Sequence, residues 1–253
     1  MEGTAVLGRL SWQLAEVLAT RTETGRTKSI TLAVPNWPGH RAGQHVDVRL
    51  SSEDGYHAER SYSIASAPEA QPQLMITVER LDSGEVSPYL TEELRVGDRL
   101  EMRGPIGGYF VWEAMMGGPL LLVAGGSGIV PLMAMIRHRV AAGSTVPTRL
   151  LYSSRTYEDI IFRDELEQLS KSANMLEVTH TLTREAPSGW TGYHRRIDEE
   201  MLRDTAFPSD QYPLIFLCGP TPFVETAATL LVRVGHDAKR IKTERFGPTG
   251  ERN

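Results

Sequence analysis

The hydrophobic pattern of this chain changes near residue 118, and this change restricts the fold more than any other feature of the sequence. Before it, short segments at 41–50, 74–80 and 99–103 alternate apolar and polar side chains between turn residues. After it, continuous apolar runs alternate with helical stretches. The first pattern is typical of an antiparallel β-barrel, and the second of a doubly wound α/β domain with a parallel sheet. The sequence therefore predicts two domains, residues 1–114 and residues 115–253.

The second half begins with Leu-Leu-Leu-Val-Ala at 120–124, which is apolar at every position, as in a strand buried on both faces. Further strands are predicted at 148–152, 176–182 and 213–218, and helices at 131–142, 164–172, 199–204 and 222–234. No charged residue lies between Glu113 and Arg137, a length that could span a bilayer. Five glycines and two prolines interrupt it, so we expect a strand, a turn and a helix and no membrane span.

Composition excludes several classes of protein. Cys218 is the one cysteine, so the chain has no internal disulfide and no four-cysteine iron–sulfur site of its own. The net charge of −5 lacks the basic excess of a nucleic-acid-binding protein. The seven histidines are scattered, and we expect no metal site. The first residues carry no signal-peptide pattern, so a cytoplasmic location is expected, and we expect a monomer.

A glycine-rich turn follows the first apolar strand of the second half. Residues 125–131 are Gly-Gly-Ser-Gly-Ile-Val-Pro and open a predicted helix. Glycines let the backbone approach a diphosphate, and a helix N-terminus offers N–H donors and positive potential. Such turns also occur for packing reasons alone, so the motif needs its strand–turn–helix context to indicate a nucleotide site.

Two segments of the first half also carry candidate functional residues. Residues 60–63, Arg-Ser-Tyr-Ser, could hold a diphosphate, a flat ring and a ring nitrogen, or could form an ordinary strand with a packed tyrosine. Residues 84–88 are Gly-Glu-Val-Ser-Pro and precede a predicted helix at 89–94. Ser87 is predicted as its N-cap, with Pro88 in the first helical position. This helix start could bind a second anion or only cap the helix.

In combination and in order, these segments resemble the ferredoxin–NADP reductase family. The resemblance is carried by residues 60–63, 84–87, 104–110, 126–131 and 218–220 and extends from about Gly39 to Phe246. It implies a flavin-binding barrel followed by a nicotinamide-nucleotide domain. It also implies a hydride passed from the nicotinamide to the flavin, which the protein assists mainly by stacking the two rings.

The resemblance implies a role for individual residues. Arg60 would pair with the flavin diphosphate, Tyr62 would pack on the isoalloxazine ring, and Ser63 would lie near its N5 atom. Ser127 would meet the nicotinamide, and Cys218 would lie beside its reactive carbon or serve as a buried structural thiol. A second phosphate subsite at 85–87 favours FAD over FMN. Other residues expected in the cofactor sites are Ser61, Thr77, Val78, Glu79, Glu85, Val86, Ser87, Gly126, Gly219, Pro220 and Phe246. The place of Phe246 stays open, because residues 244–247 depart from the plant-type pattern with a terminal tyrosine.

Charge favours NADPH over NADH. NAD-specific sites often carry a carboxylate after the second strand, but here that strand ends in Ser154 and Arg155, with no acid before Glu158. A hydroxyl and a guanidinium suit a 2′-phosphate. Arg184 and Arg195 resemble arginines that bacterial members use for this phosphate. Alternatively, Arg155, Arg184 and Arg195 could all be solvated surface residues.

The sequence thus predicts an FAD enzyme that oxidises NADPH and passes single electrons to a redox protein. A ferredoxin, a flavodoxin, or an oxygenase or molybdoenzyme subunit could accept them. Two alternatives stay open. The chain could be an NADH-dependent reductase component of an oxygenase or molybdoenzyme system, or a regulatory subunit that binds flavin without turnover.

Overall fold

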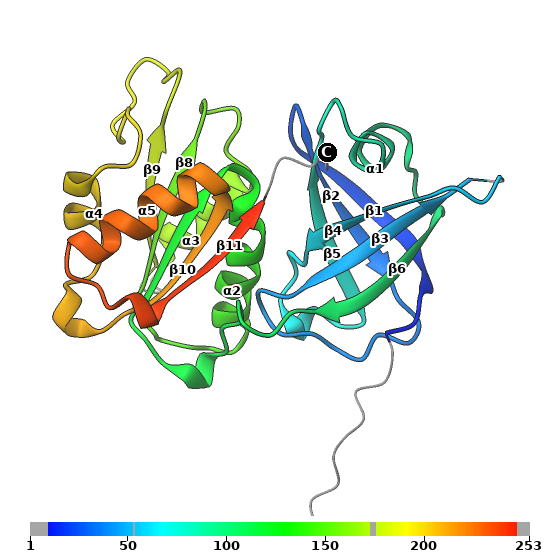
Figure 1. Ribbon diagram of the computed structural model, residues 1–253, viewed down its shortest axis with the longest axis horizontal. Helices are drawn as coiled ribbons and strands as arrows, with labels where there is room; N and C mark the ends of the chain where they lie inside the picture. Colours follow the sequence, from blue (N-terminus) through cyan, green and yellow to red (C-terminus); the bar gives the residue numbers. More distant parts are fainter. Residues whose placement is uncertain (1–9, 53, 173–175, 247–253) are drawn as a thin grey trace, which may run out of the picture.

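The computed structural model describes residues 10–52, 54–172 and 176–246 and forms two domains that lie side by side (Figure 1). Within these ranges, the first domain is an antiparallel barrel with strand order β4-β3-β6-β1-β2-β5. The second is a parallel sheet with strand order β11-β10-β7-β8-β9. The predicted fold class is therefore confirmed for both halves of the chain.

The first domain is made of six strands, a 3₁₀ turn at Pro68–Ala70 and a short helical segment between β5 and β6. Its strands are β1 (Gln13–Thr24), β2 (Thr27–Ala33), β3 (His45–Ser51), β4 (His57–Ser63), β5 (Gln73–Glu79) and β6 (Arg99–Ile106). An antiparallel bridge between Ile64 and Ile76 joins the end of β4 to β5 and closes the sheet. In β5 the period-2 alternation of side chains buries Leu74 and Val78 completely in the barrel core. The opposite face of β5 therefore carries Thr77 and Glu79.

The parallel sheet has helices on both faces. Its strands are β7 (Leu120–Gly125), β8 (Thr148–Ser154), β9 (Leu176–Leu182), β10 (Leu214–Pro220) and β11 (Ile241–Phe246), and its helices are α2 (Ile129–Ala141), α3 (Arg163–Lys171), α4 (Glu199–Thr205) and α5 (Thr221–Arg233). Every residue of β7 is buried. Leu120 and Leu122 pack with residues of α2 and α3, whereas Leu121 and Val123 pack with α4 and α5. This double burial explains why the strand is apolar at each position.

Helix α2 lies between the parallel sheet and the barrel (Figure 1). Seven of its buried residues belong to one apolar cluster that also contains Ala42, Ala65, Phe110 and Trp112 from the first 112 residues. The two domains therefore share a continuous hydrophobic core and are not separate bodies joined by a linker alone.

Arg137 on α2 adds a polar connection to this joint. Its Nε and Nη2 atoms donate to the two carboxylate oxygens of Glu165 at 2.8 and 2.6 Å, and its Nη1 atom donates to the carbonyl of Ala65 at 2.7 Å. The guanidinium carbon lies 4.7 Å from the ring centre of Phe162. Because the side chain is only 15% exposed, these contacts hold α2 against the barrel residue that follows β4.

Three local predictions differ from the structure. The helix after residue 84 begins at Val86, as α1 (Val86–Pro88) followed by a π-helical turn over Tyr89–Glu93, and its N-cap residue is Glu85. The prediction that Ser87 caps this helix is wrong, because its hydroxyl instead accepts a hydrogen bond from the Leu81 amide at 3.1 Å. Strand β3 begins at His45, not at residue 41, and α2 begins two residues before Pro131.

The charge-free stretch from 114 to 136 contains a 3₁₀ turn at Ala114–Met116, then β7, a second 3₁₀ turn at Gly126–Gly128 and the first part of α2. In the described part of the chain, no helix combines the length and the apolar character that crossing a membrane requires.

Candidate functional site

A cavity of about 460 Å³ lies where β4 and β5 face the second domain; we call it the β4–β5 cavity. Arg60, Ser61, Tyr62 and Ser63 line it from β4. Their positions follow from the strand, because β4 pairs with β3 along its whole length and ends at the mouth of the barrel. The segment 60–63, proposed from the sequence, is therefore gathered at one concave surface.

The side chains of this segment differ in environment. Tyr62 is partly buried against the barrel core, and this burial raises the pKa of its phenol. The ring is thus held as a neutral, flat wall of the cavity. Ser63 is buried, and the Ser61 hydroxyl donates to Asp47 at 2.7 Å. The Arg60 Nη1 atom donates to the carbonyl of Glu59 at 2.7 Å.

Strand β5 forms the neighbouring wall. Thr77 and Glu79 line the β4–β5 cavity, while the side chain of Val78 points into the barrel core. The Thr77 hydroxyl is hydrogen-bonded to the hydroxyl of Ser29 at 2.8 Å. Of these three predicted residues, Val78 can therefore reach a ligand only through its backbone.

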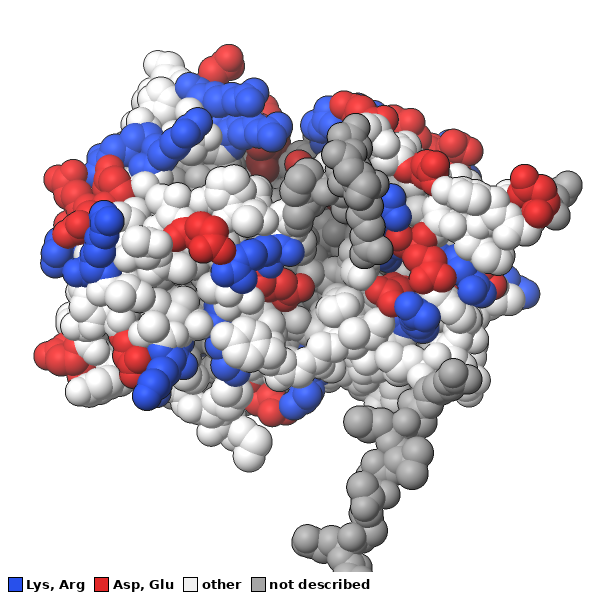
Figure 2. All heavy atoms as spheres, viewed as in Figure 1, with Lys and Arg blue, Asp and Glu red and all other residues white. Residues whose placement is uncertain are grey.

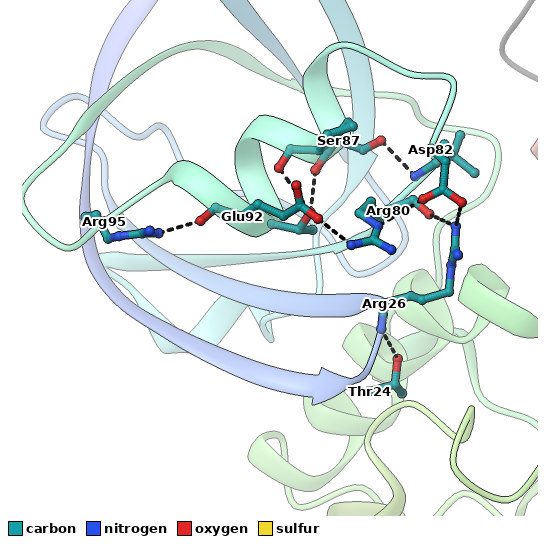
Figure 3. A network of polar contacts seen from close by, with 10 residues as sticks. Thr24, Arg26, Arg80, Asp82, Ser87, Glu92 and Arg95 are labelled. Carbon is teal, nitrogen blue, oxygen red and sulfur yellow. Dashed lines mark hydrogen bonds and ion pairs between the residues drawn. The ribbon is translucent and has the colours of Figure 1, made fainter.

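The loop from 81 to 87 completes the β4–β5 cavity with Leu81, Gly84, Val86 and Ser87. Figure 3 shows how polar contacts hold this loop. Ser87 binds the Leu81 amide, Arg80 forms ion pairs with Asp82 and Glu92, and the carbonyl of Glu92 accepts from Arg95 at 2.7 Å. The Glu85 carboxylate is exposed and accepts from the Tyr56 hydroxyl at 2.8 Å. Only the backbone of Glu85 is thus suited to an anion.

A second cavity, of about 450 Å³, opens at the carboxyl end of the parallel sheet; we call it the glycine-turn cavity. Gly125, Gly126 and Ser127 line it after β7, as predicted. Gly126 has a φ of +55°, and a Cβ built on it would meet no atom within 4 Å. The backbone here therefore borders open space, which a phosphate group could occupy.

Gly128 serves a different purpose from Gly126. A Cβ on Gly128 would lie 2.1 Å from the carbonyl oxygen of Cys218 and 2.7 Å from the amide nitrogen of Gly219. The start of α2 thus approaches β10 so closely that only glycine fits. This contact fixes the turn relative to the strand that carries residues 218–220.

Cys218 lies behind the wall of the site. It is fully buried and does not line either cavity, and burial raises the pKa of its thiol. The next exposed position on β10 is Pro220, which lines both cavities. A Cβ on Gly219 would meet Phe223 and the Gly125 backbone at about 3 Å, so Gly219 serves the packing of the two strand ends.

The predicted arginines are placed differently from one another. Ser154 and Arg155 line the glycine-turn cavity at the end of β8, beside Thr183. Arg184 is exposed and outside the lining, although its amide donates to the Arg155 carbonyl at 2.9 Å. Lys and Arg side chains gather on this edge of the molecule, above β8 and β9 (Figure 2).

Arg195 is also outside the cavity. Its guanidinium forms ion pairs with Asp198 at 2.5 Å and with Glu200 at 3.0 Å, and it lies over the ring of Tyr193. The neighbouring Arg196 lines the cavity instead. Arg196 was not singled out from the sequence, where its adjacency to Arg195 was the only available signal.

The two cavities meet. Five residues line both of them, namely Glu79, Ser127, Arg155, Pro220 and Pro222. Phe246 at the end of β11 lines the β4–β5 cavity next to this shared wall. A ring bound in one cavity and a ring bound in the other can therefore approach each other at Ser127 and Pro220.

Glu244 on β11 is a half-buried acid that sequence reasoning did not assign. It pairs in register with Cys218 across β10 and β11. Burial raises the pKa of its carboxyl to about 7. Its signal in the sequence was its place two residues before Phe246, on the same face of the strand.

Comparison with known sequences identifies both domains. Residues 19–111 match the oxidoreductase FAD-binding domain, and residues 122–229 match the oxidoreductase NAD-binding domain. The chain is 36% identical over 209 residues to a protein named ferredoxin–NADP reductase B of Sorangium cellulosum, covering 81% of this chain and 84% of that protein. The chain belongs to the ferredoxin–NADP reductase family.

Other relatives of this reductase family member are longer. The chain is 34% identical over 211 residues to the glycine betaine monooxygenase reductase subunit of Chromohalobacter salexigens. The matched region covers 83% of this chain but only 56% of that protein. Among solved structures, the cytochrome P450 reductase of Amycolatopsis aligns with this chain with a TM-score of 0.82 and 26% sequence identity. The alignment covers 98% of this chain and 74% of that one. A ferredoxin–NADP reductase of Neisseria gonorrhoeae with bound FAD and NADP shares the fold, with a TM-score of 0.79 at 20% identity over 92% of this chain and 98% of that one.

The family resemblance inferred from the sequence is therefore confirmed. This reductase family member is an oxidoreductase with an FAD-binding and a nicotinamide-nucleotide-binding domain, as predicted.

Proposed function

We propose that the chain is an NADPH-dependent reductase that passes electrons from FAD one at a time to a redox protein such as a ferredoxin or a flavodoxin. The junction of the two cavities at Ser127 and Pro220 is the observation that carries this proposal. It offers one site for a flavin on the barrel and one for a nicotinamide nucleotide on the parallel sheet, with a shared wall between them. We also propose residues 1–114 as the flavin unit and 115–253 as the nucleotide unit, in a cytoplasmic monomer.

The β4–β5 cavity fits FAD. Tyr62 and the β5 face offer flat walls for the ring system, and Ser63 offers a hydroxyl beside them. Arg60 and the backbone of 85–87 offer donors for a diphosphate. When bound, FAD accepts a hydride and releases electrons singly, which no side chain of this chain can do.

The glycine-turn cavity fits NADPH. The open backbone at Gly126 suits the diphosphate, and Arg155 with Arg196 suits the 2′-phosphate, because a guanidinium matches phosphate oxygens in a bidentate manner. Ser127 and Pro220 then orient the nicotinamide toward the flavin. Cys218 contributes from outside the cavity, because its backbone fixes the position of Gly128. Phe246 covers the flavin side of the junction.

Acid extraction of the purified protein is expected to release FAD and not FMN. The reason is that the 81–87 loop adds a second group of phosphate donors to Arg60. Thin-layer or liquid chromatography of the extract identifies the flavin. Release of FMN would remove the role proposed for 85–87, and protein that takes up neither flavin would disprove the proposed function.

Arg155→Ala is expected to raise the KM for NADPH about 10-fold and to change the KM for NADH less than about 2-fold, since a partly exposed charge-assisted hydrogen bond contributes about 1.5 kcal/mol. The turnover number should stay nearly constant, because a remote phosphate is held alike in the ground and transition states. Paired steady-state kinetics with both nucleotides measure this. Arg184→Ala, outside the cavity, is the matched control. An equal loss with NADH would show that Arg155 does not read the 2′-phosphate.

A second function is favoured by the longer relatives. The chain spans 56% of the length of the glycine betaine monooxygenase reductase subunit. The reductase component of an oxygenase is therefore the alternative to a ferredoxin or flavodoxin reductase. Electron transfer assays with a ferredoxin, a flavodoxin and an oxygenase component as acceptors distinguish the two. In the oxygenase case, NADH would be the electron donor in place of NADPH, which paired kinetics with the two nucleotides would show.

A further inference from the structure

The turn between β1 and β2 belongs to the barrel, yet it forms part of the glycine-turn cavity of the other domain. Thr24, Arg26 and Thr27 line that cavity opposite the residues that follow β7 and β8. Arg26 is the cation of this turn. The barrel therefore supplies a positive charge to a cavity whose other lining arginines, Arg155 and Arg196, come from the parallel-sheet domain.

The guanidinium of Arg26 is held at one end only. Its Nη2 atom donates to the Arg80 carbonyl at 3.0 Å and to the Asp82 carboxylate at 2.9 Å (Figure 3). The same hydrogen bond is the main reason that the pKa of Asp82 lies below its ordinary value. An arginine has five N–H donors on three nitrogen atoms. Among the residues that the structure describes, the Nε and Nη1 atoms of Arg26 have no hydrogen-bond partner.

A guanidinium with free donors on two nitrogens is suited to a phosphate group, whose oxygens accept paired hydrogen bonds. The side chain of Arg26 is 40% exposed, so a ligand can reach it without displacing a packed residue.

We infer that Arg26 binds a phosphate group of the nicotinamide nucleotide across the boundary between the two domains. This inference rests on the proposed function. The group is either the diphosphate, which NADH and NADPH share, or the 2′-phosphate, which only NADPH has. In both cases the barrel reads the nucleotide directly, and Asp82 competes with the phosphate for the same guanidinium.

The test compares Arg26→Gln with Arg21→Gln in the flavin-loaded protein. Arg21 lies on β1, the strand that leads into this turn, and is more exposed, at 57%, but it does not line the cavity. The probes are NADP⁺ and NAD⁺, and their dissociation constants are measured by titration of the flavin absorbance. The Arg26 variant should bind NADP⁺ about 10-fold more weakly, and the Arg21 variant should stay within about 2-fold of the parent. An equal loss for NAD⁺ assigns the diphosphate, and a loss confined to NADP⁺ assigns the 2′-phosphate.

Asp82→Asn gives an independent readout in the opposite direction. Removal of the competing carboxylate should tighten NADP⁺ binding about 3-fold, and this gain should vanish when Arg26→Gln is also present, as expected of two residues that interact. The inference is overturned if Arg26→Gln binds both nucleotides as the parent does, or if it loses FAD while its nucleotide affinity is unchanged. A parent that binds FAD but neither nucleotide would overturn the proposed function as well.

Discussion

Gly128→Ala is expected to lower the melting temperature by about 6–12 °C and to raise the KM for the nicotinamide nucleotide at least 10-fold. The new methyl carbon would lie 2.1 Å from the carbonyl oxygen of Cys218, and the atoms it meets are backbone atoms of β10 that cannot rotate away. Overpacking of this kind costs about 3 kcal/mol, which corresponds to the stated shift for a protein of this size. The start of α2 must move, and Gly126 and Ser127 move with it.

Thermal unfolding followed by circular dichroism and steady-state kinetics measure these two effects. Gly143→Ala is the control: Gly143 has a positive φ of +61°, unlike Gly128 with its φ of −60°, but a Cβ there would meet nothing within 4 Å. It should cost only about 1 kcal/mol, the usual strain of a left-handed residue. The flavin content of both variants should equal that of the parent, since the β4–β5 cavity is built mainly on the barrel. A Gly128→Ala protein as stable as the control variant would contradict the close approach of α2 to β10.

Arg137→Ala is expected to destabilise the protein by about 3 kcal/mol and to slow reduction of the flavin by NADPH about 10-fold. The substitution leaves Glu165 without its bidentate partner and removes the donor that binds the Ala65 carbonyl. Loss of one partner from a largely buried ion pair costs about 3–5 kcal/mol, and the 29% exposure of Glu165 places the effect at the low end. Flavin reduction slows because α2 carries the glycine turn and loses its connection to the residues after Ser63.

Differential scanning calorimetry and stopped-flow absorbance are the measurements. Arg137→Lys should recover only part of the loss, since one ammonium cannot reproduce the planar fork. Arg163→Ala removes a surface arginine of α3 that is 37% exposed and should change stability by less than about 0.5 kcal/mol. If Arg137→Ala unfolds at the parent temperature and reduces its flavin at the parent rate, the polar connection does not position the two sites.

The sequence predicted best the strands whose residues form a clear apolar or alternating run. Strand β9 has the predicted bounds, and β7 extends the predicted run by one residue. Strand β1 was not predicted, because Leu14 and Leu18 lie on its outer face at 52% and 38% exposure and obscure the alternation with the buried Ala15 and Val17. Strand β11 was hidden by the charged residues Lys242, Glu244 and Arg245 among its six positions.

For the candidate site, the sequence and the family resemblance named the segments but not the direction of each side chain. Residues 60–63 and 125–127 line the cavities as expected. Arg195 and Arg196 are adjacent, and no pattern in the sequence distinguishes them. The choice is made by Asp198, which caps α4 and also binds Arg195, so that Arg196 is the one at the cavity. Cys218 likewise follows the strand register and faces away from the ligand side.

The joint between the domains also determines how freely either one could be exchanged with that of a relative. The Met75 sulfur of the barrel lies 3.6 Å from the Nη1 atom of Arg137, a long contact. The short contact from the barrel is made by the backbone carbonyl of Ala65, and the carboxylate partner Glu165 belongs to the same domain as the arginine. This polar contact would therefore form in a chimera with almost any barrel sequence. The apolar contacts of α2 with Phe110 and Trp112 depend on side-chain shape and would not. A functional chimera should therefore carry residues 110–112 together with the nucleotide domain.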